Sequence, residues 1–434
     1  MGDKIAEYVN TICQQIRWKK ARGRVFDEMT AHITDARDAY IAQGLDEAAA
    51  TEQAITDTGD AAILGASFDR VHRPKPQWGM IAAVAGFLII GIVADFLLLN
   101  GIVSFNRRLE FTVIGFVIML AVYFVDFTIL GKYLWVIVSA FIAFVAFLAW
   151  ISVDIGFARG QALSLIFPLM LAICIFALRN AGIKGIVISG VVYGVFCIFG
   201  LMLFFASFLH FAVVGMAILL VVIWRNWFGI SNLLKIGATL ATLTPFVILA
   251  FWHMVFTNSL RSASRVAAAF NPHLDPQGWG FSALQARRVL SGAALFGQGA
   301  GEEIARTTFL PDARNNFFLT NIAYNYGLIP FIAIILALAA FIVVGFIRCF
   351  KQKSDLGFLV SFAVVATFTM QAVTYIAFNL GITLTLMTLP LISPGNSAMV
   401  VNLALLGFML SVFRTGDAAP RHKPPQPYSS PQAQ

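Results

Sequence analysis

The first part of the chain spaces its apolar residues with the period of an amphipathic helix. Apolar positions recur three or four residues apart, at Ile5, Val9, Ile12, Cys13, Ile16, Val25, Met29, Ile33 and Ala36. Such spacing places the apolar side chains on one face of a helix. Gly44 and Gly59 are each followed by an aspartate, Asp46 and Asp60, which is typical of a helix end and the cap of the next helix. The pattern predicts a small helical domain over residues 1–76.

From Trp78 onward, long and nearly continuous apolar runs replace this pattern. A transmembrane helix needs about 20 mostly apolar residues to cross a hydrocarbon core of about 30 Å. Ten runs approach or exceed this length, at about residues 78–101, 108–127, 129–151, 160–179, 183–203, 205–224, 227–256, 316–347, 356–379 and 387–413. We therefore predict an all-α fold with ten transmembrane helices within residues 77–413. The Pro-, Gln- and Ser-rich residues 414–434 are typical of a disordered tail.

Composition excludes a water-soluble enzyme. Hydrophobic residues make up 59% of the 434 residues and charged residues only 12%, whereas soluble proteins have about 25% charged residues. So few charges cannot cover a water-exposed surface. The four cysteines show no CxxC spacing, and no histidines have the spacing of a zinc site. We therefore expect no metal and no other cofactor.

The charge is unevenly distributed and predicts the topology. Residues 1–77 carry 10 Lys or Arg and 12 Asp or Glu, while the rest has a net charge of +10. Basic residues beside apolar spans follow the positive-inside rule, so they do not indicate nucleic-acid binding. The N-terminal domain shares its side with connections that contain Lys132, Arg179, Lys184, Arg225, Lys235, Arg348, Lys351, Lys353 and Arg414. The opposite short connections have few basic residues apart from Arg107, Arg108 and Arg159. We expect a multi-pass cell-membrane protein with both termini in the cytoplasm.

The long connection at residues 257–315 lies on the predicted outer side. A connection of this length is usually functional or disordered, and its ordered motifs argue against disorder. In order they are Arg265, Asn271-Pro-x-x-Asp275-Pro276, Gly278, Gly280, Gln285, Gly292, Gly297, Gly299, Phe309-Leu-Pro-Asp312 and Phe317.

These motifs resemble the outer loop of the shape, elongation, division and sporulation family, the FtsW/RodA/SpoVE proteins. The family pattern is an arginine, Asn-Pro-x-x-Asp-Pro with glycines, a Gln-bearing helix, a Gly-rich turn and then Phe-Leu-Pro-Glu. Near the C-terminus, the segment from Leu389 to Ser397, which contains Ser393, resembles the family's Leu-Pro-Phe-Ile-Ser-Tyr-Gly-Gly-Ser. The resemblance covers about residues 80–413.

The resemblance implies a peptidoglycan glycosyltransferase that polymerises lipid II beside a class B penicillin-binding protein. In this reaction a sugar hydroxyl displaces a diphosphate, so a carboxylate base would activate the acceptor. Cationic side chains would hold the diphosphate. The candidate substrate-binding residues are Arg265, Asp275, Gln285, Arg287, Arg288, Arg314 and Ser393.

The predicted catalytic position departs from the family pattern. Alignment through Phe317 places Asn316 where the family has its catalytic aspartate. A neutral amide cannot accept a proton, so general-base catalysis at this position is lost. Asp312 is the nearest remaining carboxylate, and it is either a substitute base or a helix-capping or ion-pairing residue. Other charged family positions are replaced by Gln161, Ser164, Tyr324 and Asn325.

Three functions remain open from these residues. The first is polymerisation of lipid II, the second a non-catalytic lipid-carrier-binding scaffold for a penicillin-binding protein, and the third transport of a lipid-linked precursor. Asn316 favours the second, while the retained loop motifs favour the first. Asp95, inside a predicted span, is a further functional candidate, because ionisable residues within membranes are costly.

The N-terminal residues carry a separate resemblance. Residues 1–75 are similar to the permease prefix domain of Gram-positive membrane proteins. The matching stretches include Cys13-Gln-Gln-Ile-Arg17, Gly44-Leu45 and Gly59-Asp60. This similarity indicates a Gram-positive bacterial source.

The charge asymmetry generates a topology prediction. A cysteine introduced at Ser282, within residues 257–315, should react with a membrane-impermeant thiol reagent added to intact cells. Labelling of this cysteine only after permeabilisation would reverse the assigned orientation.

Overall fold

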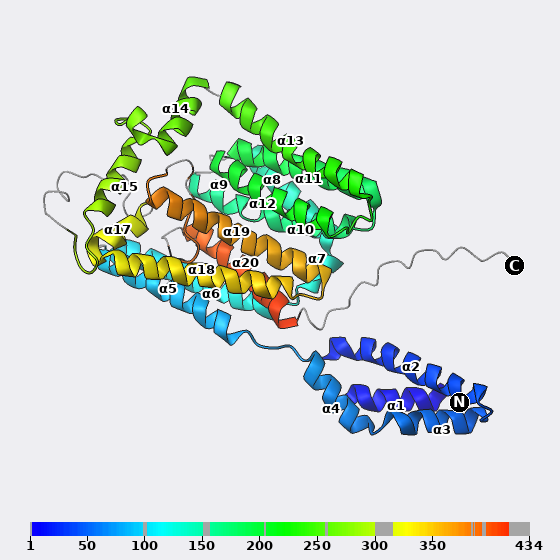
Figure 1. Ribbon diagram of the computed structural model, residues 1–434. Coiled ribbons are helices and arrows are strands. Elements are labelled where there is room, and N and C mark those ends of the chain that lie inside the picture. The colour runs from blue at the N-terminus through cyan, green and yellow to red at the C-terminus, as the bar shows by residue number, and fades with distance from the viewer. Residues whose placement is uncertain are drawn as a thin grey trace. The chain divides into compact units, whose positions relative to one another are not determined.

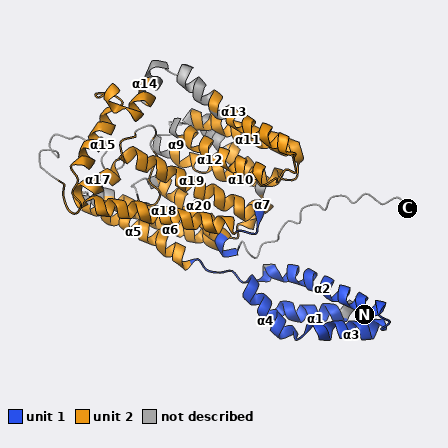
Figure 2. Ribbon diagram, in the orientation of Figure 1, with its two compact units in different colours: residues 1–77, 352–355, 413–434 blue, residues 78–351, 356–412 orange. Residues whose placement is uncertain are grey.

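The structure is a computed structural model (Figure 1), and it describes residues 2–98, 102–150, 157–203, 205–256, 259–299, 316–382, 385, 387–392 and 396–415. The chain divides into two compact units (Figure 2). Unit 1 comprises residues 1–77, 352–355 and 413–434, and unit 2, here called the membrane unit, comprises residues 78–351 and 356–412. Every element in the described ranges is a helix, which confirms the predicted all-α fold. The predicted tail after Thr415 lies outside the described residues.

Four helices form an N-terminal bundle in unit 1. They are α1 (Gly2–Gln15), α2 (Lys19–Ala42), α3 (Glu47–Thr58) and α4 (Ala61–His72). The side chains of Asp46 and Asp60 accept backbone N–H groups from the first turns of α3 and α4, so each caps the helix that follows it. Gly44 and Gly59 have φ angles of 98° and 99°, a left-handed conformation that glycine adopts without strain.

The core of this bundle consists of the residues that carry the helical period. It contains Ile5, Val9, Ile12, Cys13, Ile16, Ala21, Val25, Met29, Ile33 and Ala54. Burial raises the pKa of the Cys13 thiol, which therefore stays protonated and packs as a small apolar group. Two long-range hydrogen bonds tie the helices together. The Arg17 N–H donates to Asp69 Oδ1 at 2.8 Å, and the Tyr8 hydroxyl donates to the Gly59 carbonyl oxygen at 2.7 Å.

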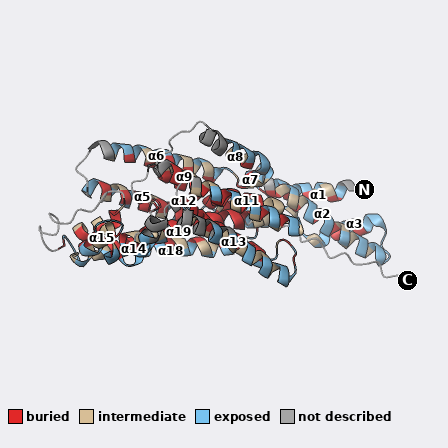
Figure 3. Ribbon diagram, turned by 90° about the horizontal axis from the view of Figure 1, so that it is seen from above, coloured by how far each residue is buried: buried red, intermediate tan, exposed pale blue. Residues whose placement is uncertain are grey.

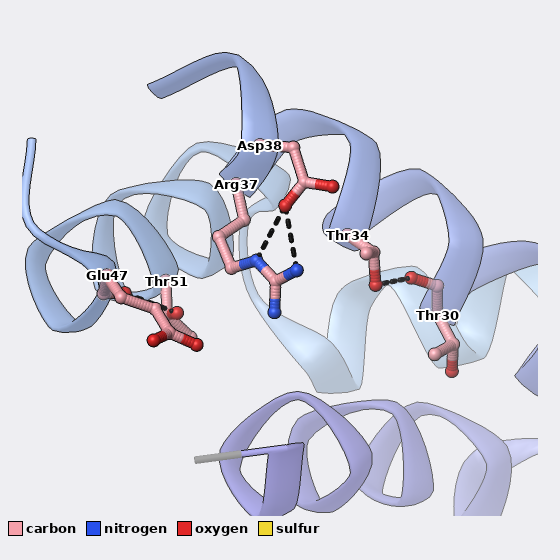
Figure 4. Close-up of polar contacts among 6 residues, drawn as sticks. All are labelled: Thr30, Thr34, Arg37, Asp38, Glu47 and Thr51. Carbon is pink, nitrogen blue, oxygen red and sulfur yellow. Dashed lines mark hydrogen bonds and ion pairs between the residues drawn. The ribbon is translucent and has the colours of Figure 1, made fainter. Parts of the chain in front are cut away.

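Polar contacts on the bundle surface are local (Figure 4). Arg37 donates two hydrogen bonds to Asp38 Oδ1, at 2.9 and 2.7 Å. The Thr34 hydroxyl donates to the Thr30 carbonyl oxygen at 2.7 Å. An exposed ion pair contributes at most about 1 kcal/mol, so the apolar core, rather than these contacts, accounts for the stability of the bundle.

The membrane unit contains a bundle of apolar helices, most of them long, and all but one of the connections in this bundle are short. They are α5 (Trp78–Leu98), α6 (Ile102–Phe124), α7 (Thr128–Lys132), α8 (Leu134–Trp150), α9 (Phe157–Ser164), α10 (Phe167–Leu178), α11 (Gly182–Leu203), α12 (Phe205–Trp224), α13 (Asn232–Phe256), α18 (Leu328–Phe350), α19 (Asp355–Asn379) and α20 (Asn396–Thr415). Between α13 and α18 lie α14 (Ser259–Phe270), η1 (Pro272–Leu274), α15 (Phe281–Ser291) and α17 (Phe318–Tyr326).

Seven spans in the described residues are long and apolar enough to cross a membrane. They lie in α5, α9–α10, α11, α12, α18, α19 and α20. Helices α6, α8 and α13 occupy the positions of the other three predicted spans. The chain is therefore a multi-pass membrane protein.

The structure interrupts three runs that we predicted as continuous spans. The run 160–179 consists of two helices, the run 316–347 is divided at Gly327, and the helical part of the run 387–413 begins only at Asn396. Gly327 has φ 101°, which ends α17. An apolar run cannot reveal such a break, because both the helices and the connection between them are buried in apolar surroundings.

Burial differs strongly between neighbouring helices of the membrane unit (Figure 3). Most residues of α19 are buried, whereas α18 exposes large apolar side chains such as Ile332, Leu336 and Val343. Exposed apolar surface of this kind is unfavourable in water and favourable against lipid. The lipid-facing helices therefore enclose an inner layer whose buried positions can hold polar groups.

The N-terminal core generates a stability prediction. The isolated residues 1–72 should give a helical circular dichroism spectrum and unfold cooperatively. Ile12→Ala, at a fully buried position, should lower the free energy of unfolding by about 2–5 kcal/mol. The same change at the exposed Ile63 should alter it by less than about 0.5 kcal/mol. A random-coil spectrum for the fragment would contradict the prediction.

Candidate functional site

The buried polar contacts described here lie at one end of the membrane unit. We call it the loop end, because α13 ends there and the connection through α14, α15 and α17 begins there (Figure 1). The short connections make successive membrane helices alternate in direction. The loop end therefore also holds the end of α5, the start of α6 and the end of α19.

The sequence from Asn271 to Gly280 forms a closed turn after α14. The Asp275 carboxylate accepts the N–H groups of Gly278 and Trp279, at 3.0 and 2.9 Å. A Cβ at Gly278 would lie 2.3 Å from Asp275 Oδ2, and one at Gly280 would lie 2.1 Å from the Pro272 carbonyl oxygen. The motif thus needs its glycines, and Asp275 holds the turn together. Its predicted role in substrate binding stays a prediction.

Helix α15 follows this turn and is anchored to the end of α19. Gln285 is buried, and its Oε1 has no hydrogen-bond partner among the described residues. Arg287 Nη2 donates to the carbonyl oxygen of Gly381 at 3.1 Å. Gly381 has φ 83°, and a Cβ there would lie 2.9 Å from Arg287 Cγ. Arg288 is exposed on the same helix, so α15 presents two neighbouring cationic residues at the loop end.

The glycine-rich segment after α15 pairs with the connection between α17 and α18. The N–H groups of Gly297 and Gly299 donate to the carbonyl oxygens of Tyr326 and Tyr324, at 3.1 and 2.8 Å. A Cβ at Gly327 would lie 2.5 Å from the Leu295 carbonyl oxygen. The glycines therefore allow two backbone segments to approach closely, and they position the end of α17.

Asn316 lies directly before α17, and a single buried side chain holds both. Asn379 is fully buried at the end of α19. Its Nδ2 donates to the Asn316 carbonyl oxygen at 3.0 Å, and its Oδ1 accepts the Thr320 N–H at 3.0 Å. The Tyr375 hydroxyl accepts the Phe318 N–H at 3.3 Å. Residues from α19 thus satisfy N–H groups of the first turn of α17, which an α-helix cannot satisfy by itself.

A buried ion pair lies beside this helix. Arg108 of α6 and Asp95 of α5 are 2% and 1% exposed, and Arg108 Nη1 lies 3.7 Å from Asp95 Oδ1. Arg108 also donates to the carbonyl oxygen of Ile392, and its guanidinium lies 5.9 Å from the centre of the Phe318 ring. A Cβ at Gly91 would lie 2.3 Å from Arg108 Nη2. The guanidinium therefore joins four segments of the chain.

The structure describes five of the predicted site residues with their side chains, namely Asn316, Asp275, Gln285, Arg287 and Arg288. All five lie at the loop end. Arg265 lies within α14, but its side chain is outside the described residues, as are Asp312, Arg314 and Ser393. In the described part of the chain, no group of three or more His, Cys, Asp or Glu side chains could hold a metal ion.

Sequence reasoning missed two residues that hold the site together, Arg108 and Asn379. The sequence marked Arg108 as a basic residue on the outer side, where basic residues are few, and Asp95 as an ionisable residue within a predicted span. It did not show that the two side chains would lie close together. Nothing in the sequence indicated the role of Asn379, because polar residues are common at the ends of helices.

The fold and the site together define a multi-pass α-helical membrane protein with an ordered loop over the bundle. A sequence model of FtsW/RodA/SpoVE, described as cell cycle proteins, matches residues 78–417. The chain belongs to the FtsW/RodA/SpoVE family, and the predicted resemblance is confirmed.

Similar proteins support this assignment. The probable peptidoglycan glycosyltransferase FtsW of Halothiobacillus neapolitanus is 30% identical over 185 residues, which cover 41% of this chain and 43% of that protein. The FtsW of Enterococcus hirae, of the same description, is 28% identical over 187 residues, 42% of this chain and 47% of that protein. The matches thus span less than half the length of these curated relatives.

Solved structures share the fold. One chain of a peptidoglycan synthase complex, described for its coordination of polymerization and crosslinking, has a TM-score of 0.61 at 18% identity. The match covers 78% of this chain and 98% of that chain. The rod shape determining protein RodA of Thermus thermophilus has a TM-score of 0.53 at 16% identity and covers 79% of this chain and 97% of its own.

The contacts of Asn379 generate a prediction for the site. Asn379→Ala leaves the Asn316 carbonyl oxygen and the Thr320 N–H without this partner, so it should destabilise the purified chain by about 1–3 kcal/mol. Thermal unfolding in detergent measures the change. Asn325→Ala is the matched control, because among the described residues the hydrogen bonds of that side chain reach only Asn321, one turn earlier. Equal melting temperatures for the two variants would contradict the role of Asn379.

Proposed function

We propose that this chain is a divergent FtsW/RodA-like protein of bacterial cell-wall assembly that binds a lipid-linked peptidoglycan precursor at the loop end. The activity that we propose first is polymerisation of lipid II, the reaction of a peptidoglycan glycosyltransferase. The observation that carries the proposal is the ordered loop scaffold, in which Asp275 closes its turn, the glycine segment pairs with the end of α17 and Asn379 holds the backbone of residue 316. Family membership over residues 78–417 supports it.

Electrostatics at the loop end fits an anionic substrate. Arg287 and Arg288 lie on α15, and Arg108 is buried beside α17. Guanidinium groups bind phosphate oxygens in pairs of hydrogen bonds. Asp95 offsets part of the positive charge, so the arginines of α15 are the better candidates for direct contact with a diphosphate.

Asn316 favours a second function, a non-catalytic scaffold that binds a lipid carrier and a class B penicillin-binding protein. The Asn379 side chain fixes the backbone of residue 316. The side chain at this position is an amide, which cannot act as a general base. The solved relative in a peptidoglycan synthase complex supports such a partner. Incubation of the purified chain with lipid II and a partner synthase separates the two functions, because formation of glycan polymer would exclude the scaffold.

The remaining features of the proposal concern location. We assign both termini to the cytoplasm, residues 257–315 to the outer face and the N-terminal bundle to a permease-prefix-like domain of a Gram-positive bacterium. The charge asymmetry of the connections supports the orientation. The four-helix bundle with capped α3 and α4 supports an independently folded domain.

The amide at position 316 generates a kinetic prediction. General-base assistance is worth about 10²–10⁴-fold, so wild type should polymerise lipid II slower by about that factor than a relative with an aspartate there. Asn316→Asp is isosteric and keeps the backbone bond to Asn379. We nevertheless expect it not to restore activity, because Gln161, Ser164, Tyr324 and Asn325 differ too and positioning of the substrate needs the whole set.

Two results would change this assignment. A large gain in polymer formation by Asn316→Asp would show that the rest of the catalytic site is intact. Loss of wild-type activity in Asp312→Ala would show that Asp312 is the base. Gel analysis of polymer from labelled lipid II measures both.

A further inference from the structure

An apolar groove lies between α11 and α13 on a lipid-facing side of the membrane unit. Its volume is about 540 Å³. Helices α11 and α13 form its walls and α12 its floor, and the three helices pack against one another (Figure 1). Val187 on one wall and Ile248 on the other are each 57% exposed, whereas Leu219 on the floor is 2% exposed. The groove is therefore open along its side and closed towards the bundle.

The hydroxyl groups that line the groove are already bonded within the chain. The Tyr193 hydroxyl donates to the carbonyl oxygen of Ala212 at 2.8 Å. The Thr242 and Thr244 hydroxyls donate to backbone carbonyl oxygens of their own helix, at 2.8 and 3.1 Å. The other lining side chains are aliphatic or aromatic. An occupant of the groove thus meets hydrocarbon, and a polar occupant would lose its own hydrogen bonds there.

Two glycines of α11 border this space. Gly190 and Gly194 both line the groove, and a Cβ at either would meet nothing within 4 Å. Both lie in regular helix, where glycine is less stable than alanine. Neither the backbone conformation nor the packing of the chain itself requires glycine here. The space in front of them is available to another molecule.

The groove is about as long as one leaflet is deep. Its lining runs from Ile186 to Ile198 on α11 and from Ala238 to Ile248 on α13. At 1.5 Å per residue these stretches measure about 18 and 15 Å, whereas the whole hydrocarbon core is about 30 Å thick. Both helices begin at the end opposite the loop end, and the lining starts within their first two turns. A transmembrane helix of a partner would need a groove about twice as long, but one acyl chain of the leaflet on that side matches its length.

Two lysines stand at the mouth of the groove. Lys184 precedes Val187 by three residues and Lys235 precedes Ala238 by three, so each lies on the groove side of its helix. Helical side chains tilt towards the N-terminus, which here is the membrane surface. Residues 155–256 contain no Asp or Glu, so no carboxylate of the groove helices neutralises these cations. The apolar groove therefore ends in a positively charged mouth.

We propose that this groove binds one acyl chain of an anionic phospholipid from the leaflet opposite the loop end, with Lys184 and Lys235 holding the lipid phosphate. Basic groups between transmembrane helices are suited to anionic headgroups. The positive-inside rule accounts for lysines at this end, but it does not account for an open groove bordered by glycines. The lipid is a bound partner rather than a reactant, because Asn316 lies at the loop end. The proposal does not rest on the proposed polymerase activity.

The test measures thermal unfolding of the purified full chain in dodecyl maltoside against lipid concentration. Palmitoyl-oleoyl phosphatidylglycerol is the anionic probe. Phosphatidylcholine with the same chains tests the headgroup, and dihexanoyl phosphatidylglycerol tests the need for a long chain. We expect the anionic probe to raise the melting temperature saturably, with an apparent Kd at least tenfold below that of phosphatidylcholine. Dihexanoyl phosphatidylglycerol should give no saturable shift.

A variant that fills the groove tests where the chain binds. Gly194→Leu should weaken the apparent Kd for the anionic probe at least tenfold and should not lower the melting temperature without lipid, since leucine is the better helix former. Gly86→Leu is the matched control. A Cβ at Gly86 also meets nothing within 4 Å, but this residue lies on α5 and does not line the groove. Its affinity should equal that of wild type.

A variant without the two cations tests the headgroup contact. The double variant Lys184→Gln and Lys235→Gln should lose the preference for phosphatidylglycerol over phosphatidylcholine. Lys351→Gln, an exposed position after α18 on the same side of the unit, should keep the preference. The lysine changes leave the apolar packing intact, so they test the site even if Gly194→Leu does not fold.

Four results would overturn the proposal. The first is equal affinity of wild type for phosphatidylglycerol and phosphatidylcholine, and the second is equal stabilisation by dihexanoyl phosphatidylglycerol. The third is unchanged affinity in Gly194→Leu. The fourth is a dimer in native mass spectrometry that Gly194→Leu dissociates, which would make the groove a docking surface for a second copy of the chain. Failure to polymerise lipid II would refute the proposed function alone.

Discussion

A guanidinium inside an apolar helix bundle is stable only if a carboxylate pairs with its charge and carbonyl oxygens accept hydrogen bonds from its N–H groups. Arg108 meets this constraint through Asp95 and Ile392, and the arrangement of the loop end depends on it. Because its partners come from α5 and from the segment before α20, the pair holds together elements that are nearly three hundred residues apart. Removal of either partner would leave an uncompensated buried charge.

A second set of polar bonds lies along one face of α19. Gln371, Tyr375 and Asn379 are four residues apart and fully or almost fully buried. Gln371 exchanges two hydrogen bonds of 3.0 Å with Asn402 of α20, and Asn379 holds residue 316. Interhelical amide bonds are a common means of fixing helices in a membrane, where apolar contacts distinguish poorly between alternative packings. The face of α19 therefore specifies how α17 and α20 sit around the site.

In this protein, the contacts that fix the backbone of the loop are independent of the side chain at position 316. The turn at Asp275, the close approach at Gly327 and the bonds of Asn379 all concern backbone position. None of them requires a carboxylate at residue 316. A family member can therefore lose its catalytic base and retain the shape of its loop, which is the physical basis for weighing a slow polymerase against a binding scaffold.

Apolar periodicity and charge bias alone predicted an all-α membrane protein, the N-terminal helices and the position of the loop, because those properties depend on local spacing and on the thickness of a bilayer. Motif spacing located Asn316 and the turn at Asp275. The tertiary structure alone decided that Asp95 meets Arg108 and that Asn379 caps α17. These facts depend on contacts between distant segments, and an apolar sequence carries almost no information about which polar residues will face each other once the helices pack.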